Sequence, residues 1–369
     1  MIIILTQCFP PAIGGIENLM GGAARHLSAR GHNVRVLADG RAFPANGYGD
    51  VQYFSGFKPL RNLRKIRALR RLSNSGNVEA LLADSWKSLE TLGRSGRAEK
   101  VGRIVCFAHG NEFPQQANAE KGARIRASLS LSSCIIANSQ FTADRVRSYV
   151  DDGKIIVRAP AIDGVATVSD EDREWAENCW KNGHPRLLSL ARLEPLKGID
   201  QGIIAVKSLI ADYPNLRYVI AGAGDDFSRL QKLVEENRLG GHVAFVGVVR
   251  GERKSALYSS ADVFVMPTRR VGSREEAFGM VYLEAALHGL PVIGGFAGGA
   301  REAVIDGQTG SLVDGSSSPA VLEAIRNLLE NPPRRKEMSM AAAWFATRFT
   351  WSGQIESLEK DLGIGGEHA

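Results

Sequence analysis

Four ionisable residues in the second half of the sequence have types and spacings suited to nucleotide chemistry: Arg192, Lys197, Glu276 and Glu284. The pattern around Gly279 predicts a loop that carries Glu276 into a helix that carries Glu284, about two turns further on. Free N–H groups at a helix N-terminus bind phosphate, and carboxylates accept hydrogen bonds from sugar hydroxyls. By spacing alone, two solvated glutamates on an amphipathic helix are the simpler interpretation.

Arg192 and Lys197 follow an apolar run, Leu187–Ala191, and precede a helix-like segment. A guanidinium group grips phosphate oxygens in a bidentate manner, and an ammonium group supplies a compact point charge. Together the two cations could neutralise a nucleoside diphosphate. Two cations in a loop are otherwise ordinary surface charge.

Three further candidates follow apolar runs in the first half of the sequence. Gly14 and Gly15 come after Ile2–Leu5, where glycines let backbone N–H groups approach a ligand closely, although an ordinary turn has the same composition. The motif is not a complete G-x-G-x-x-G, so dinucleotide binding is poorly supported. His109 follows Ile104–Ala108, at the strand end where such sheets bind ligands, but a lone histidine is more often structural.

Two series of short apolar runs alternate with helix-like segments, which is the pattern of two doubly wound α/β domains. The strands that we expect are Ile2–Leu5, Val34–Ala38, Ala80–Ala83, Ile104–Ala108, Cys134–Ala137 and Ile155–Val157, then Leu187–Ala191, Tyr218–Ala221, Val243–Val246, Val263–Met266 and Pro291–Ile293. The pattern loosens over the polar residues 163–184, which predicts a domain boundary near 160–185. Trp351–Leu362 is the last helix expected.

The composition is that of a soluble globular protein. Of 369 residues, 44% are hydrophobic and 23% are charged, which excludes a disordered or fibrous chain. No apolar run is long enough to cross a bilayer, and we expect no signal peptide. Cys8, Cys106, Cys134 and Cys179 are scattered without metal-ligand spacing, so we expect reduced thiols and a cytoplasmic protein.

The net charge of +6 is unevenly distributed, with +10 in residues 1–165 and −4 in residues 166–369. Residues 58–71 hold seven cations in fourteen positions, with Leu60, Leu63, Ile66 and Leu69 at every third position. This pattern predicts an amphipathic basic helix. An anionic membrane surface and plain solvent are the two environments that suit it, and the basic first half favours the membrane. No nucleic-acid motif accompanies the run, so we expect no nucleic-acid partner.

The segment Glu276–Ile293 resembles the E-x7-E motif of glycosyltransferase family 4, which comprises retaining enzymes of the GT-B fold. Ala277 departs slightly from that motif, because many members have glycine there. Arg192–Gly198 resembles the diphosphate-binding pair of the same family, and Pro10–Glu17 resembles its N-terminal P-x-x-G-G-x-E loop. His109–Glu112 resembles an H-G-x-E element on the acceptor side. The resemblance extends from Pro10 to Trp351.

The resemblance implies two Rossmann-like α/β domains that face each other across a cleft. Residues 1–165, joined by the returning C-terminal helix 350–364, would form the acceptor domain, and residues 170–348 the nucleotide-sugar domain. The implied roles are catalysis by Arg192, Lys197, Glu276 and His109; donor binding by Gly14, Gly15, Phe278, Gly279, Met280, Val281, Glu284, Gly222 and Val248; and acceptor contacts by Glu17, Glu112 and Asn138.

The implied reaction is retaining transfer of a hexosyl group from a GDP- or UDP-sugar, without a metal or other cofactor. GDP-mannose is the expected donor, and the expected acceptor is a lipopolysaccharide, an exopolysaccharide or a lipid-linked glycan. A cytoplasmic enzyme, peripheral on the inner face of the cytoplasmic membrane, fits the basic helix. The alternatives are a nucleotide-sugar epimerase or hydrolase, and a non-catalytic sugar-binding protein. The four intact ionisable residues of the donor motifs disfavour the last.

Overall fold

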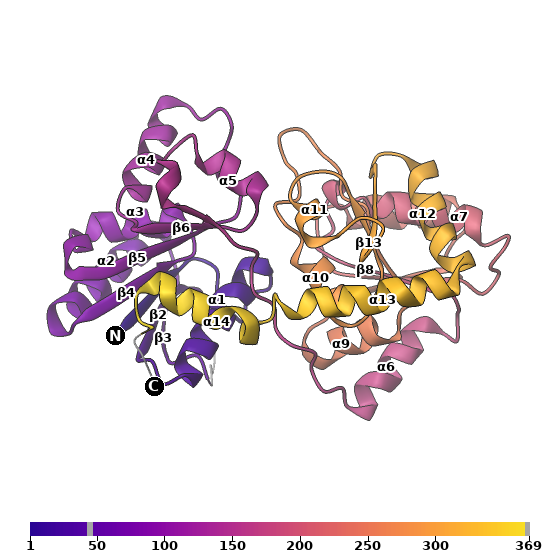
Figure 1. Cartoon of the computed structure of the whole chain (residues 1–369), viewed down its shortest axis with the longest axis horizontal. Helices are drawn as coiled ribbons and strands as arrows, with labels where there is room; N and C mark the ends of the chain where they lie inside the picture. The colour runs from indigo at the N-terminus through magenta and orange to yellow at the C-terminus, as the bar shows by residue number, and fades with distance from the viewer. Residues whose placement is uncertain (43–46, 366–369) are drawn as a thin grey trace. The chain divides into compact units, whose positions relative to one another are not determined.

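The chain folds into two compact α/β units, each built on its own parallel sheet (Figure 1). The structure is a computed structural model that describes residues 1–42 and 47–365. The first unit comprises residues 1–163 and the C-terminal residues from Phe349 onward, and the second comprises residues 164–348. The chain therefore passes between the units twice, within a few residues of the expected domain bounds of 165, 170, 348 and 350.

The sheet of the first unit has the strand order β3-β2-β1-β4-β5-β6-β7, and all its strands are parallel. Its strands are β1 (Ile2–Thr6), β2 (Val34–Asp39), β3 (Asp50–Phe54), β4 (Val78–Ala83), β5 (Val101–Ala108), β6 (Cys134–Ala137) and β7 (Ile155–Val157). Its helices are α1 (Gly15–Ala29), α2 (Lys58–Ser75), α3 (Trp86–Ser95), α4 (Ala119–Leu129), α5 (Gln140–Val146) and α14 (Trp351–Leu362), with short 3₁₀ turns η1 (Ala98–Lys100) and η2 (Asp152–Lys154).

Both faces of this sheet are covered, which explains the continuous apolar runs of its strands. Side chains alternate between the faces of a strand. Ile2 and Ile4 pack under α1 and α14, whereas Ile3 and Leu5 pack under the helices α2 to α5. Cys106 and Cys134 are buried on this sheet.

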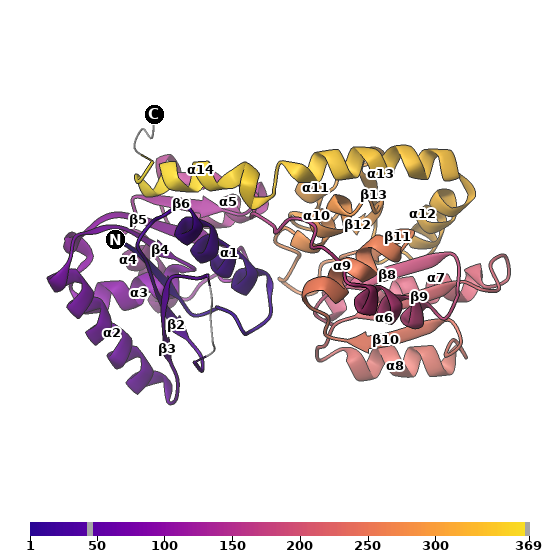
Figure 2. The same ribbon diagram turned by 90° about the horizontal axis from the view of Figure 1, so that it is seen from below.

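The final helix α14 lies against α1, at the other end of the chain (Figures 1 and 2). The Trp351 side chain is 3% exposed and stacks on the His26 ring, with the ring centroids 5.4 Å apart. A Cβ atom at Gly22 would lie 2.1 Å from the Trp351 Nε1 atom. A glycine is therefore required for the two helices to approach this closely.

Replacing Trp351 by alanine should lower the free energy of unfolding of the first unit by about 3–5 kcal/mol, because it removes a buried indole and leaves a cavity. Urea unfolding of the full chain measures this effect. Trp344→Ala is the matched control, since Trp344 is 70% exposed and should change stability by only about 0.5 kcal/mol. Equal shifts for the two variants would contradict the packing role of Trp351.

The sheet of the second unit has the order β10-β9-β8-β11-β12-β13, again all parallel. Its strands are β8 (Arg186–Leu190), β9 (Arg217–Ala221), β10 (Val243–Gly247), β11 (Val263–Met266), β12 (Val292–Gly295) and β13 (Gly310–Val313). Its helices are α6 (Asp170–Trp180), α7 (Ile199–Leu209), α8 (Phe227–Glu236), α9 (Gly251–Ser260), α10 (Met280–Leu287), α11 (Ala300–Ala303), α12 (Ser318–Glu330) and α13 (Pro332–Thr347), with a 3₁₀ turn η3 (Pro195–Lys197).

The helices α7, α8 and α12 pack on one face of this sheet, and α6, α9 and α10 contact the strands from the other (Figure 2). Three elements differ from the sequence expectation. The edge strands β3 and β13 were not expected, and α6 occupies part of the polar stretch 163–184 that was interpreted as a loosened boundary. Only two α6 side chains, Ala176 and Trp180, are buried, so the helix has little apolar pattern.

Candidate active site

The candidate donor residues of the second unit lie in loops after four parallel strands. Arg192 and Lys197 follow β8, Gly222 follows β9, Val248 follows β10 and Glu276 follows β11. The carboxyl ends of parallel strands share one edge of the sheet, where doubly wound folds bind ligands. The strand order therefore brings together residues that are up to 84 positions apart in the sequence.

Lys197 and Glu276 form a salt bridge across this edge. Lys197 ends η3, and its Nζ atom donates to the Glu276 Oε2 atom. The two side chains are 16% and 12% exposed, so the pair is largely shielded from water. A cation and a carboxylate that can accept hydrogen bonds from sugar hydroxyls are therefore held side by side.

Arg192 is more open, with 64% of its side chain exposed. Its Nη1 atom lies 3.5 Å from the carboxylate of Glu194, which also accepts a 2.7 Å hydrogen bond from Arg274. Both candidate phosphate-binding cations thus face a carboxylate of the chain. Sequence reasoning did not identify Glu194 or Arg274, because neither stands at a motif position.

The N-terminus of α10 adds backbone donors next to Glu276. Gly279 precedes the helix with φ +90°, and no side chain caps the first turn. Phe278 is 2% exposed and therefore buried, whereas Met280 and Val281 are partly exposed. The expected loop-to-helix transition is confirmed, and it has the features of an anion-binding helix end.

Glu284 lies one turn inside α10 and already has two partners on α9. Lys254 Nζ is 2.9 Å from Oε1, and the Tyr258 hydroxyl donates to Oε2 over 3.1 Å. Glu284 is therefore no solvated surface glutamate, which corrects the simpler interpretation of its spacing. No sequence signal pointed to Lys254, which is separated from Glu284 by thirty positions.

Close backbone packing accounts for Gly222. A Cβ atom there would lie 1.8 Å from the carbonyl oxygen of Ala191, so the loops after β8 and β9 approach each other more closely than a side chain allows. Val248 is 48% exposed beyond the end of β10. The backbone at Gly298 is similarly tight, since a Cβ atom there would lie 2.0 Å from the Glu276 carbonyl oxygen.

In the first unit, Gly14 is the N-cap of α1, and no side chain caps the helix. The Glu17 carboxylate folds back over Gly14, because a Cβ atom there would lie 2.2 Å from Glu17 Oε2. Burial raises the pKa of the neighbouring Cys8 thiol to about 12, and Glu17 and Asp84 contribute to this shift. An unreactive, protonated thiol therefore lies beside the glycine loop. That this loop meets the donor phosphates stays a prediction.

His109 and Asn138 follow the neighbouring strands β5 and β6. The Nε2 atom of His109 is 2.8 Å from the carbonyl oxygen of Asp84. Because a carbonyl only accepts, Nε2 carries the proton. Glu112 accepts a 2.7 Å hydrogen bond from the His109 backbone N–H, and Asn138 Oδ1 accepts from Thr142. Glu112 and Asn138 thus hold their own loops in shape.

Asp84, which sequence reasoning missed, links the ends of three strands. It directly follows β4, its carboxylate bonds to residues at the end of β1, and its carbonyl oxygen contacts His109 after β5. Its Oδ2 atom accepts hydrogen bonds from the backbone of Gln7 and Cys8, at 2.7 and 3.2 Å, and from the Thr6 hydroxyl. Its Oδ1 atom accepts from Ser88. The position directly after an expected strand, Ala80–Ala83, was the available signal.

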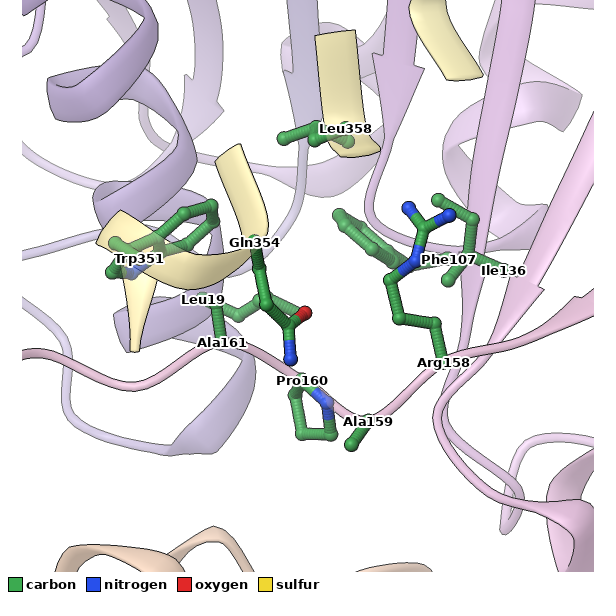
Figure 3. A pocket seen from close by; sticks show the side chains of 10 residues that line it. All are labelled: Leu19, Phe107, Ile136, Arg158, Ala159, Pro160, Ala161, Trp351, Gln354 and Leu358. Atoms are coloured by element: carbon green, nitrogen blue, oxygen red, sulfur yellow. The ribbon is translucent and has the colours of Figure 1, made fainter. Parts of the chain in front are cut away.

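A small pocket of the first unit lies beneath α14 (Figure 3). It is lined by the apolar side chains of Phe107, Ile136 and Trp351, with Arg158 and Gln354 beside it. Its volume of about 20 Å³ is close to that of one water molecule. The pocket contains none of the candidate site residues and is too small for a sugar.

The basic run forms the expected helix, α2, but its two sides differ from the prediction. Ile66 and Leu69 are buried, whereas Leu60 and Leu63 are 57% and 43% exposed. Lys65 is 2% exposed and pairs with Asp39, so it belongs to the interior and not to a basic outer face. Within residues 1–42 and 47–365, no helix is both long and apolar enough to cross a membrane.

These features define a glycosyltransferase of the GT-B fold. The family described as "Glycosyl transferases group 1" matches residues 170–344, and "Glycosyltransferase Family 4" matches residues 13–164. The chain belongs to glycosyltransferase family 4, as its motifs indicated.

Relatives and solved structures agree with this assignment. The chain is 29% identical, over 95% of each chain, to a GDP-mannose-dependent alpha-(1-6)-phosphatidylinositol monomannoside mannosyltransferase of Mycolicibacterium smegmatis. It is 25% identical to a monoacylated-substrate counterpart from Corynebacterium glutamicum, over 96% of this chain and 94% of the relative. Anabaena HepE in complex with UDP and glucose superimposes with a TM-score of 0.81 at 20% identity, covering 98% and 99% of the two chains, which shows the shared fold.

Proposed function

We propose that the protein transfers mannose from GDP-mannose to a glycolipid, with retention of anomeric configuration. The observation that carries this proposal is the pairing of Lys197 with Glu276 beside the uncapped N-terminus of α10. Such a site offers a cation for a departing diphosphate and a carboxylate for sugar hydroxyls. The two mannosyltransferase relatives, which match over nearly their whole length, support GDP-mannose as donor and a phosphatidylinositol mannoside as the class of acceptor.

In the proposed reaction, the bond between the sugar C1 atom and the diphosphate oxygen breaks. The acceptor hydroxyl oxygen bonds to C1 on the same face, and its proton passes to the departing phosphate oxygen. Preorganised positive charge stabilises such a transition state, and Lys197, Arg192 and the α10 amides supply it. Glu276 orients the sugar. Independence from a metal ion stays a prediction, and unchanged transfer in the presence of EDTA would agree with it.

A glycolipid acceptor requires the enzyme to reach a lipid surface, and the outer side of α2 suits this task. Phe57 is 72% exposed at the helix start, close to the exposed Leu60 and Leu63. Exposed cations accompany them along the helix: Lys58, Arg64, Arg67, Arg70 and Arg71. Apolar side chains flanked by cations favour an anionic membrane surface over plain solvent. The proposed location is the inner face of the cytoplasmic membrane.

Neutralising Arg64, Arg67 and Arg71 together as glutamines should weaken binding to phosphatidylglycerol-containing vesicles by about 100-fold, at about 1 kcal/mol for each cation. Flotation with phosphatidylcholine vesicles, with and without phosphatidylglycerol, measures this effect. The triple variant of exposed lysines Lys207, Lys232 and Lys336 in the second unit is the matched control. Unchanged flotation of the α2 variant would contradict the membrane role.

The proposed function is tested by incubating the chain with GDP-mannose, UDP-glucose or ADP-glucose, with and without a phosphatidylinositol mannoside acceptor. We expect a mannosylated glycolipid only with GDP-mannose and acceptor together, with the α-anomeric configuration retained. Sugar epimers or free sugar formed at full rate from donor alone would indicate the epimerase or hydrolase instead. Binding of the donor without any turnover would indicate a non-catalytic protein.

A further inference from the structure

Two helices of the second unit share a polar cluster that the proposed chemistry does not yet explain. Lys254 and Tyr258 lie one turn apart on α9, and His288, the residue that directly follows α10, lies one turn beyond Glu284. Such spacing places each pair on one face of its helix. Lys254 and Tyr258 each contact a different oxygen of the Glu284 carboxylate, at 2.9 and 3.1 Å. The Tyr258 ring also packs against the His288 ring, with centroids 5.1 Å apart.

Burial determines which of these groups are charged and which donate hydrogen bonds. Tyr258 is fully buried, and burial together with the charge of Glu284 raises the pKa of its hydroxyl well above the usual value. The hydroxyl therefore stays protonated and donates to the carboxylate. Burial also lowers the pKa of His288, so its ring is neutral at pH 7 and its Nδ1–H donates to the Glu284 carbonyl oxygen. Lys254, with 25% of its side chain exposed, is then the cation that balances Glu284.

The two contacts leave the carboxylate with unused acceptor capacity. An ionised carboxylate has about four lone-pair sites, and one is used on each oxygen. Each oxygen can accept one more hydrogen bond, which matches the two neighbouring hydroxyls of a ribose. Glu284 remains 12% exposed, so a ligand can reach it.

We propose that Lys254 and Tyr258 are positioning residues that hold the Glu284 carboxylate ready for the ribose diol of the nucleotide donor. The inference rests on the proposed function, because it requires a nucleoside diphosphate in the second unit. α9 also begins directly after the loop that contains Val248, where the base is expected. One helix thereby connects the expected base loop to the ribose-binding carboxylate.

The test measures dissociation constants of GDP and UDP, and of their 2′,3′-dideoxy counterparts, which lack both hydroxyls of the diol, by isothermal titration calorimetry. The wild type should prefer the ribose form of whichever nucleotide it binds. Lys254→Met should weaken binding of that ribose form by about tenfold, the size expected for a hydrogen bond to a charged group, and leave the dideoxy form nearly unchanged. Donor KM should rise while kcat changes little. Tyr258→Phe, which retains the buried ring, should show a smaller loss of the same kind.

The matched control is Lys232→Met, which removes a lysine from an exposed Lys–Glu pair on α8. An unchanged ribose preference in Lys254→Met and Tyr258→Phe would overturn the inference. Equal weakening of ribose and dideoxy forms by Lys254→Met would also overturn it, since Lys254 would then act on the phosphates. A wild-type protein that binds neither GDP nor UDP would instead contradict the proposed function itself. This outcome is distinct from the two that overturn the positioning role of Lys254 and Tyr258.

Discussion

Replacing Lys197 by alanine should lower sugar transfer by about 100- to 1,000-fold, the range seen when one preorganised charge-stabilising group is removed from an active site. Lys197 has the position for this effect, because η3 holds it at the carboxyl edge of the sheet with only 16% of its side chain exposed. The leaving diphosphate would lose its most shielded cation, since Arg192 is far more open to solvent. Binding of nucleoside diphosphate should weaken as well. Steady-state transfer and calorimetric titration measure the two effects.

The Lys197 experiment has a close control in Lys207→Ala. Lys207 lies in the adjacent helix α7 and is exposed, so its removal should leave transfer unchanged. Circular dichroism of both variants checks that the second unit stays folded. Turnover of Lys197→Ala within a few-fold of wild type would remove Lys197 from the catalytic machinery.

Replacing Glu276 by alanine should also abolish most transfer, by about 100-fold, because the donor sugar loses its orienting carboxylate. Its effect on nucleotide binding should have the opposite sign to that of Lys197→Ala. In the structure the Glu276 carboxylate pairs with the Lys197 ammonium group, so a diphosphate that binds Lys197 has to share or displace this salt bridge. Removing the carboxylate frees the ammonium group, and binding of the diphosphate alone should become up to about tenfold tighter.

The exposed Glu323 of α12 provides the control for loss of a negative charge, and Glu323→Ala should alter neither sugar transfer nor diphosphate binding. The informative comparison is between the two members of the pair. If Glu276→Ala weakened diphosphate binding as strongly as Lys197→Ala, the carboxylate would be holding the lysine in place and not competing with the ligand. Near-normal turnover of Glu276→Ala would contradict a role in orienting the sugar.

The central strands were predictable because each is buried on both faces. Ile2–Leu5 and Val263–Met266 are continuous apolar runs, and both form strands. Two of the four edge strands, β3 and β13, were not predictable in this way, whereas the edge strands β7 and β10 were expected. Asp50–Phe54 has exposed residues at alternate positions, and Gly310–Val313 is only four residues long and begins with glycine. A strand with one neighbour and a partly solvated face needs no continuous apolar run, so its sequence resembles a loop.

The basic helix α2 shows a similar limit, because the sequence did not predict which of its charged residues are buried. Seven cations within residues 58–71 predicted a basic surface, and the helix itself is confirmed. Lys65 is nevertheless buried, because Asp39 at the end of β2 pairs with it and the Thr6 carbonyl accepts its hydrogen bond. Spacing along a helix shows which residues share a face. It does not show what that face meets.

For the candidate site, the sequence identified the residues and the structure showed how they pair. Arg192, Lys197, Glu276 and Glu284 were identified from the sequence alone, because each stands in a motif of contiguous residues that includes the strand end or helix start that holds it. The family and fold followed from the order of those motifs. Only the tertiary structure decided which of these charges have partners: Lys197 with Glu276, and Glu284 with Lys254 and Tyr258. Those pairs join loops and helices up to 79 positions apart, and the order of strands in the sheet brings them together.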